Sequence, residues 1–366
     1  VTRHEEARSV LRDTEHFSNA SGMKAPGVVI PVEDRLLGEL DPPRHTLVRR
    51  VMVTAMTPKV VHQAEPFIVE TARGLLASAP PVTFDLVAAY TVLLPNRVTA
   101  HLLGLPPEDA DQLARWAKEL MESSFPAMNR TDRGEGFAAA FPEFAAYIDD
   151  RVAERTAQLR AGEPRTDVLA RLVELQVDGA PLPHRQVRAL VRNLITGGLT
   201  TTSQLLGNLL HELLARPDVE HAVRADLALL DNAIEESLRL APPILFLARS
   251  CVGETAVGGC PVHQGERVIV GTASANRDER VFEDGSTFRL DRDNADAHLT
   301  FGFGSHVCPG ATLARRVARL GVEVFLDHFP EGAVRLQPGF TFEQVPTYFE
   351  FGPRRLPVVV GDVVAS

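Results

Sequence analysis

One cysteine lies in a sequence whose residue types could bind a metal. Residues 301–310 read Phe-Gly-Phe-Gly-Ser-His-Val-Cys-Pro-Gly, so Cys308 follows two glycines and precedes Pro309. The glycines allow a tight turn that can approach a flat partner closely. Pro309 suits the first position of a helix, and a helix N-terminus lowers the pKa of a cysteine thiol. The segment predicts a thiolate ligand for haem iron, a ligation that favours O–O cleavage.

The other two cysteines stand in ordinary surroundings. Cys251 and Cys260 belong neither to a Cys-x-x-Cys pair nor to a zinc-site spacing, so we expect them to be structural. Three cysteines in 366 residues argue against a disulfide scaffold and favour a reducing cytoplasm. The first residues also lack the pattern of a secretory signal.

A second group of residues could bind an anion. His45 and Arg49 stand four residues apart in a segment predicted to be helical, so they share one face of that helix. Two cations on one face could hold carboxylates, such as haem propionates, by charge-assisted hydrogen bonds.

The longest predicted helix contains an unusual run. Apolar residues recur at helical spacing from Val187 to Leu213, and Pro217 ends the pattern. Residues 196–202 within it read Thr-Gly-Gly-Leu-Thr-Thr-Thr. Adjacent helical glycines cost about 1 kcal/mol each relative to alanine, so Gly197 and Gly198 indicate close approach by another group. That group is either haem with dioxygen or a neighbouring helix packed in a groove.

The remaining chain must position these residues. The periodicity predicts helices over 4–13, 46–55, 58–76, 107–122, 138–161, 219–225, 229–240 and 310–327. Short strands are expected at 252–257, 267–271, 340–342 and 356–360, and long loops at 19–43 and 123–137. The predicted fold is mainly α with a small β-rich lobe.

The composition excludes two classes of partner. The chain carries 38 basic and 48 acidic residues, a net charge of −10, without a long basic run, which argues against nucleic-acid binding. It has no uncharged apolar run of about 18 residues, so no membrane span is expected.

Taken together, these motifs resemble those of the cytochrome P450 superfamily, and most closely its soluble bacterial members of the actinobacterial secondary-metabolism type. The segment 301–310 matches Phe-Gly-x-Gly-x-His-x-Cys-x-Gly at every fixed position, and Glu236-x-x-Arg239 resembles a second family motif. The resemblance implies a triangular prism of helices, with haem b between the long central helix and the helix after Cys308. It also implies a single catalytic domain over 1–366, whose usual first helix and strand would precede Val1.

The resemblance assigns further roles by position. Cys308 would be the iron ligand, and the haem would also be contacted by the loop residues Phe301, Gly302 and Gly310. Propionate contacts would come from His45, Arg49, Arg249 and His306. A buried, structural charge cluster would consist of Glu236, Arg239 and Arg292, although Glu236 and Arg239 alone could be an ordinary surface ion pair.

The chain departs from the family pattern in the oxygen-activating turn, where Gly198, Thr200 and Thr201 are the candidate catalytic residues. Thr201 falls on the threonine that assists proton delivery to dioxygen. Thr200 stands where the family carries an acid, and a threonine cannot ionise, although its hydroxyl can support a chain of waters. We therefore expect less efficient proton delivery, or help from groups of the substrate.

The resemblance implies a monooxygenase that takes electrons from an external ferredoxin and ferredoxin reductase and acts as a cytoplasmic monomer. The docking surface could include Arg315, Arg316 and Arg319, unless these arginines form only a solvated helix face. The substrate would be a hydrophobic small molecule, bound between the loop at 19–40 and the residues Asn193, Thr196, Gly197, Ile244, Leu245, Thr347 and Tyr348. Two alternatives stay open: a haem-thiolate enzyme that uses peroxide or couples substrate radicals, and a non-catalytic haem sensor or carrier.

Overall fold

The computed structural model describes residues 1–20, 30–127, 136–177 and 179–361. Parts of the predicted loops at 19–43 and 123–137 therefore lie outside the described residues. Among the described helices, none is both long enough and apolar enough to cross a membrane.

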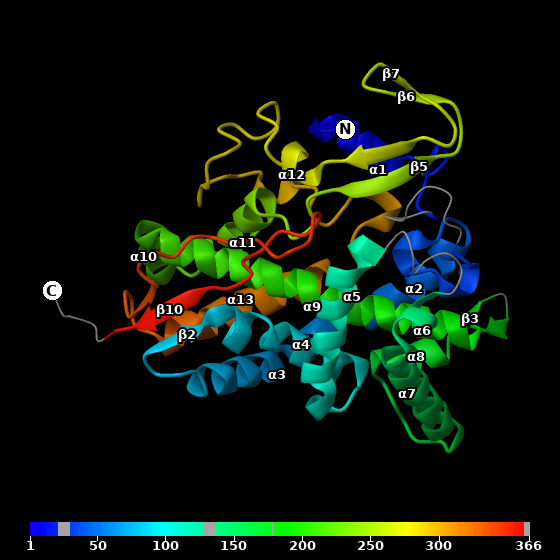
Figure 1. Cartoon of the computed structure of the whole chain (residues 1–366), viewed down its shortest axis with the longest axis horizontal. Helices are drawn as coiled ribbons and strands as arrows, with labels where there is room; N and C mark the ends of the chain where they lie inside the picture. The colour runs from blue at the N-terminus through cyan, green and yellow to red at the C-terminus, as the bar shows by residue number, and fades with distance from the viewer. Residues whose placement is uncertain (21–29, 128–135, 178, 362–366) are drawn as a thin grey trace.

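One long helix, α9 (His184–Ala215), crosses the molecule and organises its core (Figure 1). The C-terminal half of α9 packs with α3 (Pro58–Ala77), α4 (Leu93–Leu103) and α13 (Ala311–His328), and buries Leu205, Leu206, Leu209 and Leu210. Its N-terminal half belongs to a second apolar cluster. That cluster includes residues of α2 (Arg44–Ala55), α5 (Ala110–Ala127), α7 (Pro142–Arg160) and α8 (Val168–Val173).

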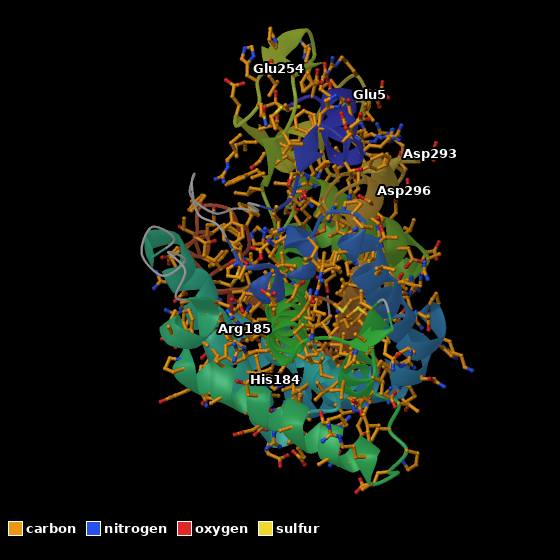
Figure 2. All side chains as sticks on the ribbon, turned by 90° about the vertical axis from the view of Figure 1, so that its right-hand side faces the viewer. Glu5, His184, Arg185, Glu254, Asp293 and Asp296 are labelled. Atoms are coloured by element: carbon orange, nitrogen blue, oxygen red, sulfur yellow. The ribbon has the colours of Figure 1, made fainter. Side chains whose placement is uncertain are left out.

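The start of α9 is fixed at the surface by charge. His184 and Arg185 are exposed at the N-terminal end of the helix (Figure 2). Arg185 forms an ion pair with Asp34 in the short 3-10 helix η1 (Val32–Asp34), and His184 contacts Asp149 of α7 at 2.8 Å. The first contact joins α9 to the segment that precedes α2, and the second joins it to α7.

The remaining helices are short or peripheral. They are α1 (His4–Arg12), α6 (Gly136–Ala140), α10 (Pro217–Ala225), α11 (Leu229–Leu240) and α12 (Thr272–Ala275), with 3-10 turns η2 (Leu37–Glu39), η4 (Pro107–Asp109), η5 (Ala295–Ala297) and η6 (Gly304–His306), and the π-helical turn η3 (Val87–Thr91).

The strands form small antiparallel sheets. In one, β5 (Leu247–Cys251) lies between β1 (Phe17–Ser18) and β8 (Arg267–Val270); Arg249 pairs with Val268. In another, β10 (Pro357–Val360) lies between β2 (Thr83–Asp85) and β9 (Val334–Leu336). Two hairpins consist of β3 (Gln176–Val177) with β4 (Ala180–Pro181), and of β6 (Thr255–Val257) with β7 (Cys260–Val262).

The mainly helical fold with small β regions is confirmed, but some predicted elements were wrong or missing. Residues 340–342 are not a strand: the backbone N–H of Phe340 closes a turn onto Gln337, and the ring of Phe342 stacks on Phe351. The sequence analysis missed α4, whose Pro95 resembles a helix breaker. Pro95 lies in the first turn of α4, where a missing backbone N–H leaves no helical bond unmade.

One buried hydrogen bond connects η3 to α13. The hydroxyl of Tyr90 donates to the backbone carbonyl of Gly321 at 2.7 Å, and Tyr90 is fully buried. Replacing Tyr90 by phenylalanine will leave that carbonyl unpaired, so we expect a loss of about 1–3 kcal/mol in the free energy of unfolding. Urea denaturation would measure it. In the control Tyr147→Phe, the released acceptor Asp109 stays partly solvated, and a smaller loss is expected.

Candidate active site

The cysteine loop is a tight turn between the β-rich region and α13. Gly302 and Gly304 have φ angles of +75° and +74°, which side-chain-bearing residues rarely adopt. A Cβ atom on Gly304 would also lie 3.0 Å from the carbonyl oxygen of Leu11 in α1. The backbone N–H of Cys308 donates to the carbonyl of Phe301 at 2.7 Å. The glycines therefore hold Cys308 at the start of α13, which begins at Ala311 with Gly310 as its N-cap rather than at Pro309.

Cys308 is partly buried. Burial raises its pKa, although backbone N–H groups of Gly310 and Ala311 and the charges of Arg49 and Arg315 act in the opposite direction. The predicted lowering of the thiol pKa by the helix N-terminus is thus wrong for the polypeptide, because desolvation outweighs it. A metal that binds this sulfur would have to displace its proton.

Cys308 lines a cavity of about 360 Å³ between the cysteine loop and α9. Many residues predicted from the sequence meet at this cavity. They are Cys308, Phe301, Gly302, Gly310, His45, Arg49, Arg249, His306, Asn193, Gly197, Gly198, Thr201 and Ile244. Apolar residues that the sequence analysis did not identify complete the wall, among them Met52, Met56, Leu102, Leu103 and Leu247.

Four cationic or donor side chains gather on one side of this cavity. The rings of His45 and His306 stack with centroids 3.8 Å apart, and both ring nitrogens of His45 are buried without a hydrogen-bond partner among the described residues. Burial, with nearby positive charge, lowers the pKa of His45 to about 4 and that of His306 to about 3. Burial likewise lowers the pKa of Arg249, to about 10. It also lowers the pKa of Arg49. Arg49 and Arg249 supply the positive charge of this group, and Asp41 is the nearby anion that acts on His45 and Arg249. The two propionates of a haem would fit beside these side chains.

The two glycines of the oxygen-activating turn have different neighbours: a helix lies against Gly198, and the cavity lies beside Gly197. A Cβ atom on Gly198 would lie 3.0 Å from Oγ1 of Thr99, so this glycine allows α4 to pack closely on α9. The nearest atom to a Cβ on Gly197 is Nδ2 of Asn193, at 3.7 Å, so Gly197 has open space beside the cavity. Thr201 also lines the cavity, and its hydroxyl donates to the carbonyl of Gly197 at 2.7 Å.

Thr200 and Thr347 belong to a different cavity. It has a volume of about 630 Å³ and lies between α4, α5, α9 and the C-terminal segment. The hydroxyl of Thr200 donates to the carboxylate of Glu350 at 3.0 Å. The sequence analysis missed Glu350, an isolated acid between Phe349 and Phe351, because no sequence spacing places it beside α9.

Three other predicted pocket residues, Thr196, Leu245 and Tyr348, do not line the first cavity. Thr196 is buried and donates to the carbonyl of Arg192 at 3.0 Å, and Leu245 does not line the cavity. Tyr348 is 55% exposed and its ring stacks with Phe246. Of the predicted loop at 19–40, Asn19, Leu37 and Gly38 line the cavity, whereas residues 21–29 are outside the described residues.

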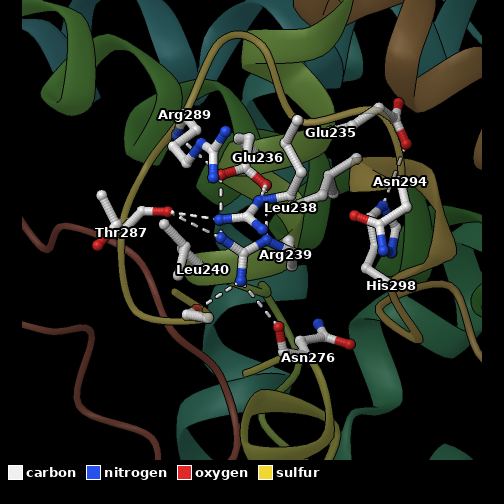
Figure 3. A network of polar contacts seen from close by, with 12 residues as sticks. Glu235, Glu236, Leu238, Arg239, Leu240, Asn276, Thr287, Arg289, Asn294 and His298 are labelled. Atoms are coloured by element: carbon white, nitrogen blue, oxygen red, sulfur yellow. Dashed lines mark hydrogen bonds and ion pairs between the residues drawn. The ribbon is translucent and has the colours of Figure 1, made fainter. Parts of the chain in front are cut away.

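The predicted charge cluster is fully buried (Figure 3). Arg239 forms two bonds with Glu236, and Arg292 Nε lies 3.0 Å from Glu236 Oε1. Glu236 and Arg239 have no exposed surface, so they are not a surface ion pair. Arg239 also donates to the carbonyls of Asn276 and Thr287, which ties α11 to the chain before the cysteine loop.

The arginines proposed as a docking patch are already paired. Arg315 contacts Glu235, Arg316 contacts Glu65, and Arg319 lies between Asp231 and Glu323. Burial alone would raise the pKa of Glu235, but the bonds from Arg315 and His298 hold it at about 2. The positive charge of these arginines is therefore neutralised locally.

Comparison with known proteins matches this geometry. Residues 116–334 match the sequence profile of the cytochrome P450 family. The chain is 34% identical to the erythromycin C-12 hydroxylase of Saccharopolyspora erythraea, with 99% of this chain and 89% of that protein aligned. It is 31% identical to the cytochrome P450 monooxygenase PikC of Streptomyces venezuelae, over 93% of this chain and 80% of that protein.

Solved structures agree with the sequence relatives. A mutant of P450 EryK in complex with erythromycin B superposes with a TM-score of 0.86 at 32% identity, covering 100% of this chain and 92% of that one. HmtN, a hydroxylase involved in himastatin biosynthesis, superposes with a TM-score of 0.84 at 30% identity, covering 99% and 90%. With its cysteine loop, its cationic cavity wall and these relatives, the chain belongs to the cytochrome P450 family and is a cytochrome P450 monooxygenase.

Proposed function

We propose that this enzyme inserts one oxygen atom from dioxygen into a hydrophobic secondary metabolite, using haem b ligated by Cys308. The observation that carries the proposal is one cavity whose wall includes Cys308, the group His45, Arg49, Arg249 and His306, and Gly197, Gly198 and Thr201 of the long helix. When bound, the haem supplies dioxygen activation.

The chain contributes binding and orientation. Cys308 would ligate the iron, and His45, Arg49, Arg249 and His306 would hold the propionates, whose negative charge would offset that of the two arginines. The Thr201 hydroxyl, held by the Gly197 carbonyl, would hold a proton beside the cavity.

The apolar wall supports a hydrophobic substrate, since Met52, Met56, Leu102 and Leu103 offer little to a charged one. The relatives that modify erythromycin or act in himastatin biosynthesis support a secondary-metabolite class. We propose an external ferredoxin with its reductase as electron source. The free thiols support a cytoplasmic location.

Turnover with different oxidants tests the reaction. We expect product only with ferredoxin, reductase and dioxygen, with one atom of labelled dioxygen in the product. Rapid turnover with hydrogen peroxide, and none with the ferredoxin system, would instead favour the peroxide-using alternative.

A substitution at Gly197 tests the position of the substrate. Replacing Gly197 by valine will place two methyl groups in the cavity without a clash at Cβ. We expect the Kd of a spin-shifting hydrophobic ligand to rise at least about 10-fold, which is about 1.4 kcal/mol, while the thiolate spectrum persists. The control Gly74→Ala changes an exposed glycine of α3 and should leave Kd unchanged. An unchanged Kd in Gly197→Val would place the ligand elsewhere.

A further inference from the structure

The carboxyl group of Glu350 lies beside Thr200, the position of α9 at which the family carries an acid. The Thr200 hydroxyl donates to Oε1 of Glu350 at 3.0 Å, although the two residues are 150 positions apart. The C-terminal segment is held in place by a bridge between Ile244 and Glu350 and by a bond from Gln344 to the Glu350 carbonyl at 2.8 Å. The contact is therefore a product of the tertiary structure and not of the helix alone.

The environment of Glu350 differs from that of a structural ion pair. Its side chain is buried, with 2% of the residue exposed, and no ion pair of the described residues includes it. Among the residues that the structure describes, the groups bonded to its carboxylate are neutral donors, from Thr200, Gln204 and Thr347. Burial raises its pKa and these donors lower it only in part. A buried acid without an ion-pair partner holds its proton to higher pH than a solvated one, which suits it to take up and pass on a proton.

Glu350 also has a path to solvent. Together with Thr200 and Gln204 it lines the 630 Å³ cavity, which is separated by α9 from the cavity that Thr201 lines. The charged residues that face the larger cavity are Asp85 of β2, Asp111, Arg115, Lys118 and Glu122 of α5, and Arg354 and Arg355 of the C-terminal segment. Several neutralise one another: Lys118 lies 3.9 Å from Glu122, and Arg355 lies 3.5 Å from Asp85. Of these charges, Glu122 raises the pKa of Glu350 further.

We propose that Glu350 is the relay acid of this enzyme, which supplies through the Thr200 hydroxyl the proton that the family delivers from an acid at position 200. The proposal rests on the proposed monooxygenase function. Glu350 takes a proton from solvent in the larger cavity and donates it to Oγ1 of Thr200. Thr200 releases its own hydroxyl proton in the same step, so one proton enters and one leaves, and no electrons move.

The released proton passes along α9 from Thr200 to Thr201. Thr200 Oγ1 lies 3.4 Å from the carbonyl of Thr196, and the next hydroxyl along the helix, that of Thr201, bonds to the carbonyl of Gly197. A solvent molecule in this turn can carry the proton from Thr200 to Thr201, beside the first cavity. Thr200 thus acts as a neutral link between Glu350 and Thr201.

The test compares Glu350→Gln with Glu343→Gln in the haem-loaded enzyme. Glu343 lies on the same segment, but it is exposed and paired with Arg354. We expect hydrogen peroxide released per NADPH consumed to rise about fivefold or more in Glu350→Gln and to stay unchanged in Glu343→Gln. Adding Thr200→Asp to Glu350→Gln should restore coupling, because it returns a carboxyl group to α9. Unchanged peroxide in Glu350→Gln, or no rescue, would overturn the proposal.

Infrared spectroscopy gives a readout that does not depend on turnover. A protonated carboxyl band should titrate above the usual glutamate range, disappear in Glu350→Gln and persist in Glu343→Gln. Thr200→Val removes a donor to the carboxylate and should move the titration to higher pH. If Glu350→Gln does not fold, a band that fails to move in Thr200→Val overturns the relay. If the unaltered enzyme shows no spectrum of thiolate ligation, that result contradicts the proposed function and not the relay.

Discussion

Replacing Cys308 by alanine will abolish the strongly red-shifted Soret band of the reduced, carbon monoxide-treated protein. The shift would come from haem iron bound by the Cys308 thiolate. Within the part of the chain that the structure describes, Cys308 is the only cysteine on the cavity wall. Monooxygenase activity should fall to background in the same variant, because thiolate ligation promotes O–O cleavage. Carbon monoxide difference spectra and product analysis would measure both effects.

Two matched variants control for the loss of a thiol. Cys260 is exposed on β7, and Cys251 is buried in β5, where its thiol donates to the carbonyl of Gly253. Cys260→Ala and Cys251→Ala should both keep the red-shifted band. A band typical of histidine ligation in the unaltered protein would contradict the assignment of Cys308.

Replacing Glu236 by glutamine will destabilise the enzyme more than any surface change. Arg239 and Arg292 would then remain buried without their carboxylate, and removing one partner from a buried ion pair costs about 3–5 kcal/mol. The amide keeps only one acceptor oxygen, so it cannot accept both from the backbone N–H of Arg289 and from the arginine side chains on the other oxygen. We expect a markedly lower urea midpoint and reduced haem incorporation, because the segment that Arg239 holds leads into the cysteine loop.

Asp291→Asn is the control for that prediction. Asp291 pairs with Arg289 close to the buried cluster, but its side chain is 77% exposed. Solvent screens such a pair, so its loss should hardly change the urea midpoint. Equal effects of Glu236→Gln and Asp291→Asn would show that the buried cluster does not support the fold.

Local sequence patterns were enough to predict most of the helices and the candidate residues of the site. Periodicity located the long helix around Val187 and Leu213, because an amphipathic pattern depends only on local spacing. The loop at 301–310 predicted the position of Cys308, since glycines with positive φ are required wherever a backbone turns that tightly. Short sequence motifs therefore predict the local backbone conformation.

The effects of neighbouring groups on these residues became evident from the fold and not from the sequence. Burial, which no sequence spacing reveals, raised the pKa of Cys308 instead of lowering it. Packing against Thr99 explained Gly198, while Gly197 was left beside the cavity. The carboxyl group that Thr200 contacts belongs to Glu350, which is 150 positions away in the sequence. Hydrogen bonds form between groups that folding brings together, whatever their separation along the chain.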